Sequence, residues 1–470
     1  MIRHQRWSSL ALLLLLGGCA TFSEDGGTRN INDALAARGV TQQSPWLKND
    51  ADAARASDAV RKLLAQPLTV DGAVQIALLN NRSLQAGYAE LGIAEADLVQ
   101  AGRLRNPGFS FGRLHRGEVV EYERTFIFDL LGLLTMPVRT RLENERFQLA
   151  QGRVTAEILQ VAADTRRAWY GAVAAQQTAS YAEQVRTAAE TAAELARRMA
   201  AAGNFSKLDH AREQAFYADA SAQLARSRQA ALAAREQLTR MMGLWGKDIA
   251  YHLPERLPDL PQTPRDIADI EQQAMRQRLD VQGAMQDAAN LADALGLVKT
   301  TGYFSVLEAK YMHNSESGEP LQTGYEIELR LPIFDFGTAR NARAEYSYMQ
   351  AVHRATDISV RARSEVREAY GAWRTAYDLA KHYREEVVPL RSRISEETLL
   401  RYNGMLMSVF ELLAESRQQV GAVISAIETQ RDFWIADTTL QFAIKGKSPG
   451  AISAPGNTLR TAAPASGGGH

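Results

Sequence analysis

The chain carries one local pattern twice, as Gly203-Asn-Phe-Ser-Lys-Leu-Asp209 and as Gly404-Met-Leu-Met-Ser-Val-Phe-Glu411. Each copy stands between two long helical patterns. In each, a glycine is followed by a serine with an acid three residues later, which is typical of one helix ending and the next beginning. We therefore predict two helical hairpins, with these stretches at their tips.

Other landmarks recur at a similar distance. Tyr170 and Tyr370 are 200 residues apart, and Phe128 and Phe334 are 206 apart. A period of this length, with strand-like and helical segments in each copy, predicts an internal twofold repeat. We expect a first repeat over 67–250, a proline-rich connection over 251–265 and a second repeat over 266–446.

Composition excludes several classes of function. The 470 residues carry 54 basic and 54 acidic side chains, so no net field attracts nucleic acid. The sequence has no metalloprotease, serine hydrolase or phosphate-loop motif, and its eight histidines form no cluster at ligand spacing. We expect no enzyme, no cofactor and no metal site.

The N-terminal residues have the pattern of a signal peptide, over 1–18. Arg3 and Arg6 precede an apolar run, Leu10 to Leu16, that is too short to span a bilayer. Cys19 follows and is the only cysteine of the chain. Leu16-Gly17-Gly18-Cys19 resembles the bacterial lipobox, which implies that Cys19 is acylated; the alternative is a chance cysteine. Residues 19–66 are polar without sustained periodicity, and we predict a lipid-anchored extended segment.

Hydrophobic periodicity and turn residues predict the remaining elements. A first helix is expected to open at Thr69 and to run toward Leu104. Strands are expected over 109–115, 119–128, 303–313 and 325–331, and long helices over 137–202, 208–244, 339–401 and 409–444. Pro389 predicts a local kink in the third long helix. The tail, 447–470, is low in complexity and is predicted to be disordered.

Two patterns suggest what these elements pack against. Residues of one predicted helix follow steps of four and three, typical of a coiled-coil seam: Val154, Ile158, Val161, Thr165, Ala168 and Ala172. The strand 325–331 alternates apolar and charged side chains, as a sheet between lipid and water does. A surface hairpin on a soluble domain is the alternative. Four strands are fewer than the roughly eight that close the smallest membrane barrel, so a membrane-spanning reading requires oligomers.

Three motifs in this order resemble the TolC-like outer-membrane efflux protein family: Leu331-Pro-Ile-Phe-Asp-Phe-Gly337, Arg401-Tyr-Asn-Gly404 and Ser408-Val-Phe-Glu-Leu-Leu413. The resemblance covers about 68–444. It implies an α+β membrane protein: a homotrimer whose protomers each give four strands to a 12-stranded β-barrel, continued by a long α-helical coiled-coil barrel. It also implies a passive gated conduit at the outer membrane, working with a periplasmic adaptor protein and an inner-membrane pump, and contacting outer-membrane lipid.

The resemblance assigns roles to the tips. It implies a periplasmic gate at Glu411, Asp209 and Tyr402, with Glu411 repeated three times around the tunnel axis. Where the family has a second acid, this chain has Ala414, followed by Glu415. Adaptor contacts are implied for Gly203, Asn204, Ser206, Gly404, Met405 and Ser408.

Simpler readings of these residues stay open. The acids could act only as helix caps and the glycines only as turn residues, while Met405 and Met407 could bind a soft metal or contact a partner. For the whole chain, the alternative is a periplasmic lipoprotein scaffold without a pore. An adaptor protein would need a lipoyl-like β domain between its hairpin arms, and the sequence predicts none.

Overall fold

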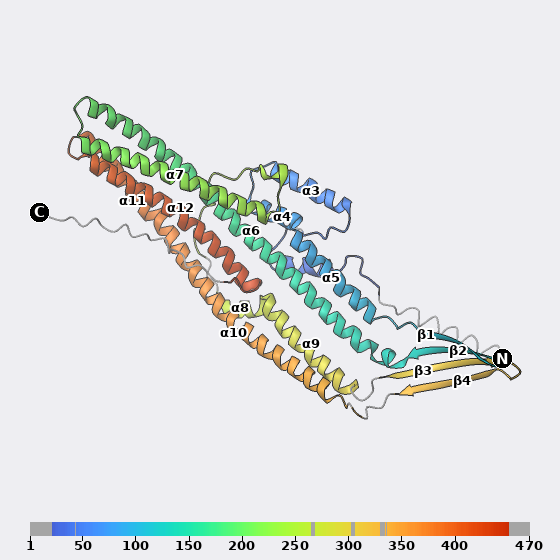
Figure 1. Ribbon diagram of the computed structural model, residues 1–470. Coiled ribbons are helices and arrows are strands. Elements are labelled where there is room, and N and C mark those ends of the chain that lie inside the picture. Colours follow the sequence, from blue (N-terminus) through green and yellow to red (C-terminus); the bar gives the residue numbers. More distant parts are fainter. Residues whose placement is uncertain are drawn as a thin grey trace. The chain divides into compact units, whose positions relative to one another are not determined.

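The computed structural model describes residues 21–42, 44–264, 268–301, 306–329, 334 and 336–450 (Figure 1). The predictions for 1–18, Cys19, 303–305, 330–333, Asp335 and 451–470 lie outside the described residues. The chain divides into two compact units. The first contains the described residues up to Ala37, with Ala86–Thr155 and Leu279–Val360; the second contains Arg38–Gln85, Ala156–Arg278 and the described residues from Arg361 on.

The first unit contains a four-stranded antiparallel sheet in the order β1-β2-β3-β4. The strands are β1 (Gly108–Arg116), β2 (Val119–Asp129), β3 (Leu307–Glu316) and β4 (Gln322–Leu329). Gly117 (φ 62°) and Gly318 (φ 88°) supply the left-handed residues of the two hairpin turns. All four predicted strands are present, but two have clearly different bounds: β3 continues past His313 to Glu316, and β4 begins at Gln322 rather than at Tyr325. The predicted strand residues 303–305, 330 and 331 lie outside the described residues.

The first unit also contains α2 (Thr28–Ala36), α9 (Leu279–Thr301) and most of α5 (Arg82–Ala101). Parts of α6 (Leu130–Ala201) and α10 (Thr338–His382) belong to it as well. The predicted start of α6 at Pro137 is wrong, because the helix begins seven residues earlier. Asp129 accepts a hydrogen bond from the Gly132 N–H (2.6 Å) and so caps the new start. Pro137 is accommodated inside the helix.

The second unit holds both helical hairpins (Figure 1). In the first, α6 is followed by α7 (Lys207–Met241). In the second, α10 continues through the π-helical turn η2 (Tyr383–Val387) into α11 (Val388–Asn403), which is followed by α12 (Val409–Lys445). The π turn directly precedes Pro389, so the predicted irregularity lies where expected. The remaining helices are α3 (Asp50–Leu64), α4 (Val70–Asn80), η1 (Gly246–Ile249) and α8 (Ile270–Gln277).

Aromatic side chains anchor the core of this unit. The Trp169 indole N–H donates to the Leu68 carbonyl (2.9 Å), and Tyr170 stacks on Trp434 with 5.4 Å between ring centroids. Trp373 packs near Phe433 and donates to Asp437 (3.1 Å). The seam predicted on α6 is confirmed by burial of all its members except Val161, which is half-buried.

Three predictions about the N-terminal half and the tail need correction. The described residues of the segment 19–66 do not form an extended lead, because α2 and α3 lie there; Asn49 caps α3 by accepting from Asp52 N–H (2.9 Å). The helix opening at Thr69 breaks at Asn81, whose extended backbone and side-chain oxygen start α5 anew. The predicted disorder begins too early, since the Ser448 hydroxyl donates to Glu365 (2.7 Å).

Among the described residues, none of the helices combines the length and the apolarity that a membrane crossing requires.

Candidate functional site

The first hairpin tip is a compact turn closed by backbone hydrogen bonds. At the end of α6, Gly203 N–H donates to the Ala200 carbonyl (3.1 Å) and Asn204 N–H to the Met199 carbonyl (3.0 Å). Gly203 is left-handed, with φ 79°. These two bonds form a Schellman motif, which satisfies the last carbonyls of the helix.

The second tip has the same motif, but its left-handed residue is not the glycine. Met405 N–H donates to the Tyr402 carbonyl (2.9 Å) and Leu406 N–H to the Arg401 carbonyl (2.9 Å). Met405 has φ 59°, whereas Gly404 has φ −79° and lies in the ordinary region. A methionine is thus held in a conformation that side chains disfavour.

The turns correspond when they are aligned on this geometry. Three positions separate the left-handed residue from the N-cap serine in both, Gly203 to Ser206 and Met405 to Ser408. Met405, which is 94% exposed, therefore stands where Gly203 stands, and Tyr402 corresponds to Ala200. If the two tips were aligned on Gly203 and Gly404 instead, Met405 would stand opposite Asn204, one residue out of step with this geometry.

Replacing Gly203 by alanine should isolate the cost of the left-handed backbone. No atom lies within 4 Å of the position that the alanine Cβ would take, so steric contact adds nothing. We expect a loss of about 1 kcal/mol in the stability of the tip. Amide hydrogen exchange at the end of α6 measures it, and Gly404→Ala, at a site with φ −79°, is the matched control. Equal effects of the two substitutions would contradict the assignment of the left-handed conformation to Gly203 and not to Gly404.

Both return helices begin at a serine cap, but only one cap is a complete capping box. Ser408 Oγ accepts from Glu411 N–H (3.4 Å), and a Glu411 carboxylate oxygen accepts from Ser408 N–H (2.9 Å). Ser206 accepts from Asp209 N–H (3.1 Å), and the Asp209 carboxylate lies 3.8 Å from Arg212. The capping roles of Ser206, Ser408 and Glu411 are therefore confirmed.

The acids at the second tip differ in their electrostatic state. Hydrogen bonds from the Ser408 backbone and hydroxyl lower the pKa of the exposed Glu411 carboxyl below its usual 4.5, so this group is ionised at neutral pH. Glu415, in contrast, is largely buried and forms an ion pair with Arg391 of α11 (3.3 Å). The second tip therefore has one exposed carboxylate, held by its helix cap, and one that is paired with an arginine.

The other tip residues contribute uncharged side chains, most of them exposed to solvent. Asn204, Gly404, Met405 and Leu406 are exposed, and Tyr402 is half-buried. Within the described part of the chain, no three His, Cys, Asp or Glu side chains gather in a way that could hold a metal ion.

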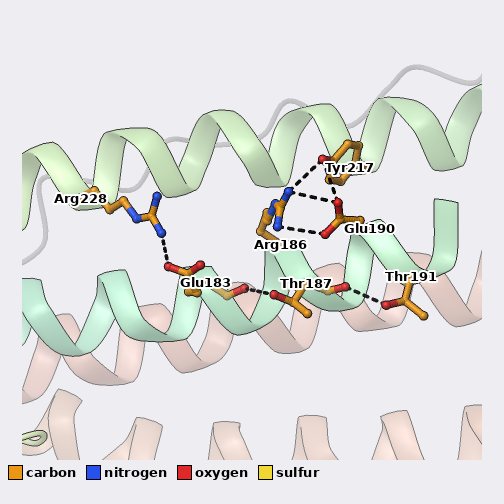
Figure 2. A network of polar contacts seen from close by, with 7 residues as sticks. All are labelled: Glu183, Arg186, Thr187, Glu190, Thr191, Tyr217 and Arg228. Carbon is orange, nitrogen blue, oxygen red and sulfur yellow. Dashed lines mark hydrogen bonds and ion pairs between the residues drawn. The ribbon is translucent and has the colours of Figure 1, made fainter. Parts of the chain in front are cut away.

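Behind the first tip, polar contacts tie α6 to α7 (Figure 2). Arg186 pairs with Glu190 (2.9 Å) and donates to the Tyr217 hydroxyl (3.1 Å), while Arg228 pairs with Glu183. These contacts hold the two arms of the hairpin in register.

A contact between the two hairpins was not predicted from the sequence. The Arg417 guanidinium of α12 lies 4.7 Å from the centre of the Phe216 ring of α7. Nearby Glu213 is only 3% exposed, and burial raises the pKa of its carboxyl, an effect that Arg417 opposes. No local pattern predicts this contact, because it joins residues 201 positions apart.

The sheet of the first unit presents a second feature, a row of aromatic side chains. The register pairs Phe109 with Phe126, Phe126 with Tyr311, and Tyr311 with Tyr325. Residues paired in this way share one face of the sheet. All four are exposed, Tyr325 to 84%, and the next row contains exposed Phe128 and Ile327.

The opposite face of the sheet is charged. Lys310 binds Glu326 (3.1 Å) and Glu328 (2.7 Å), which alternate along β4 with Tyr325 and Ile327. The alternation predicted for 325–331 is confirmed over its described part, Tyr325 to Leu329. An exposed apolar face with an aromatic row is what the lipid-facing side of a membrane sheet displays.

No protein-family model matches the chain, and no curated protein matches it in sequence. Solved structures do. VceC, an outer membrane protein from Vibrio cholerae, is 15% identical with a TM-score of 0.68, over 80% of this chain and 96% of that one. The outer membrane channel CmeC of Campylobacter jejuni is 16% identical with a TM-score of 0.64, over 84% and 86%. The open state of the MtrE outer membrane channel of Neisseria gonorrhoeae is 18% identical with a TM-score of 0.63, over 80% and 89%.

At these identities the similarity shows the fold. The chain has the mostly helical α+β fold of these outer-membrane channels, with four strands, and this part of the fold expected from its resemblance to the TolC-like family is confirmed.

Proposed function

We propose that this protein is the outer-membrane channel of a tripartite efflux system, a passive gated conduit from the periplasm to the exterior. The observation that carries the proposal is the sheet with an exposed apolar, aromatic face and a charged opposite face. An apolar face of this kind is stable only against lipid or another apolar surface.

The sheet also supports a homotrimer. Its outer strands β1 and β4 have no second partner strand among the described residues. Open strand edges are not tolerated in lipid. Three copies with four strands each would close a 12-stranded β-barrel, within the range that such barrels occupy. The helical hairpins would continue it as a coiled-coil barrel in the periplasm, one from each of two repeats, 67–250 and 266–446.

The tips would form the periplasmic end of this conduit. Three copies of Glu411 would place a ring of ionised carboxylates there, with Tyr402 and Asp209 beside it as gate residues. The adaptor would engage the exposed residues Gly203, Asn204, Ser206, Gly404, Met405 and Ser408 and shift the population toward an open state. An inner-membrane pump would supply energy, and acylated Cys19 would anchor the chain to the outer membrane.

Conductance in planar bilayers tests the proposal. We expect purified protein to run as a trimer and to produce discrete ion currents. Ile327→Arg places a charge on the apolar face and should cost about 2–4 kcal/mol per protomer near the bilayer centre, which prevents insertion. Glu328→Gln, on the charged face of the same strand, is the matched control and should retain currents.

A different result would support the scaffold reading. A protein that stays monomeric in detergent, gives no current and tolerates Ile327→Arg as well as Glu328→Gln would show that the sheet does not face lipid.

A further inference from the structure

The second unit contains a wide groove with an exposed indole at its edge. The groove has a volume of about 870 Å³ and lies between α3, the junction of α4 and α5, and the segment that follows α7. Trp245, which lines it, is 83% exposed. Leaving so large an aromatic surface in water is unfavourable, and exposed aromatic side chains often mark a binding site.

The local backbone holds the indole outward. Gly243 N–H donates to the Arg240 carbonyl and Leu244 N–H to the Thr239 carbonyl (both 3.1 Å), which ends α7 in a Schellman motif. Leu244 is buried in the core, and Trp245 follows in extended conformation, so that its side chain points the opposite way. A Cβ on left-handed Gly243 would lie 3.2 Å from the Asn80 carbonyl, so the turn sits tightly on the end of α4.

Around the indole, the lining is mixed: apolar residues such as Leu47, Ala56 and Leu79 lie beside polar and charged ones. Its polar side chains come from Asn80, Asn81, Gln85, Ser57 and Ser83, among which the Ser83 hydroxyl donates to Asn81, and its charges come from Arg82, Arg240, Lys247 and Asp248. Three cations against one carboxylate favour an anionic ligand. The far wall is also fixed, because Gln85 accepts from Leu47 N–H (2.9 Å) and donates to the Pro45 carbonyl (3.1 Å).

This chemistry matches a saccharide better than a protein. A sugar ring presents a face of C–H groups, which packs on the electron-rich face of an indole, and a rim of hydroxyls, which bond to planar amides and to guanidinium groups. The core of a protein–protein contact is depleted in lysine and acidic residues, whereas this groove is lined by Lys247 and Asp248 as well as by the indole. We propose that the groove binds an acidic glycan, namely a cell-wall glycan strand whose attached peptides carry carboxylates.

Binding would fasten the protein to the cell wall and is separate from conduction. The experiment uses the full chain in detergent and sediments it with purified cell-wall sacculi, followed by calorimetry with soluble cell-wall fragments that retain their peptides. We expect wild-type protein to cosediment and Trp245→Ala to bind at least tenfold more weakly. Arg240→Gln with Lys247→Gln should weaken binding and reduce its dependence on salt. Tyr346→Ala, which removes an exposed aromatic side chain from the first unit, is the control and should bind normally.

Several outcomes would overturn the proposal: no cosedimentation of wild-type protein, unchanged binding by Trp245→Ala, or equal binding of the peptides freed from glycan. Loss of the trimer in Trp245→Ala would overturn it too, since the indole would then be a subunit contact. Bilayer currents of Trp245→Ala should equal those of wild type, so failure here is distinguishable from failure of the channel proposal.

Discussion

Replacing Glu365 by alanine is expected to lower the free energy of unfolding of the second unit by about 3–5 kcal/mol. Glu365 of α10 pairs with Arg278 at the end of α8, and the Arg278 side chain is only 1% exposed. Its guanidinium also donates to the Ala362 carbonyl (3.5 Å). Without the carboxylate, the buried guanidinium keeps its desolvation cost and loses this ion-pair partner.

The same two helices provide a matched control. Glu271 of α8 pairs with Arg367 of α10 at 2.9 Å, but both side chains are exposed, so Glu271→Ala should cost no more than about 1 kcal/mol. The double substitution Arg278→Met with Glu365→Leu removes both charges and should recover most of the lost stability. Guanidinium unfolding followed by far-UV circular dichroism measures all variants. Equal losses in Glu365→Ala and Glu271→Ala would contradict the prediction.

The sequence predicted the long elements because their signals are long or sharply bounded. The strands have alternating side chains and glycine turns, and α7 and α12 begin at serine caps. In contrast, α3 was missed because its buried side is narrow. Ala56 and Val60 are its buried residues, and five of its 15 positions are alanines, whose small side chains bury little apolar surface and mark a core face weakly. The cap at Asn49 is the local signal that could have located its start.

Contacts of single side chains also decide where some helices end, and the sequence pattern did not reveal them. The break at Asn81 depends on one side-chain oxygen that accepts from Ser83 N–H and Ser83 Oγ, and asparagine inside an apolar pattern gives no unique warning of it. At the second tip, glycine was the expected left-handed residue, yet Met405 takes that place. Counting back three positions from the serine cap would have found it.

At the candidate site too, the contacts that are local in sequence could be predicted and those between distant residues could not. Sequence spacing located the capping pairs, because residues three apart on a helix start meet locally. It did not find the pairing of Glu415 with Arg391 or the contact of Arg417 with Phe216, because these depend on how hairpin arms pack. Trp245 was missed because a single tryptophan in a loop carries no sign of its exposure.

Substituting Glu411 by glutamine is expected to weaken cation block of the proposed channel by on the order of a hundredfold. A carboxylate that touches a cation in water contributes about 1 kcal/mol, and a trimer would lose three of them. Glutamine can keep the capping box, because its side-chain oxygen can accept from Ser408 N–H as Glu411 does. The substitution therefore removes the charge and leaves the helix start intact.

Ser408→Ala is the converse control, since it weakens the cap by about 1 kcal/mol but keeps the carboxylate. Single-channel currents titrated with a divalent cation separate the two effects: block should weaken in Glu411→Gln and persist in Ser408→Ala. Because the pKa of Glu411 is held below its usual 4.5, wild-type block should be constant between about pH 6 and 8. The cap's contribution from this carboxylate is present above pH 4.5 and is lost as the pH falls through the lowered pKa. Currents and block in Glu411→Gln that equal those of wild type would show that this carboxylate serves only as a helix cap.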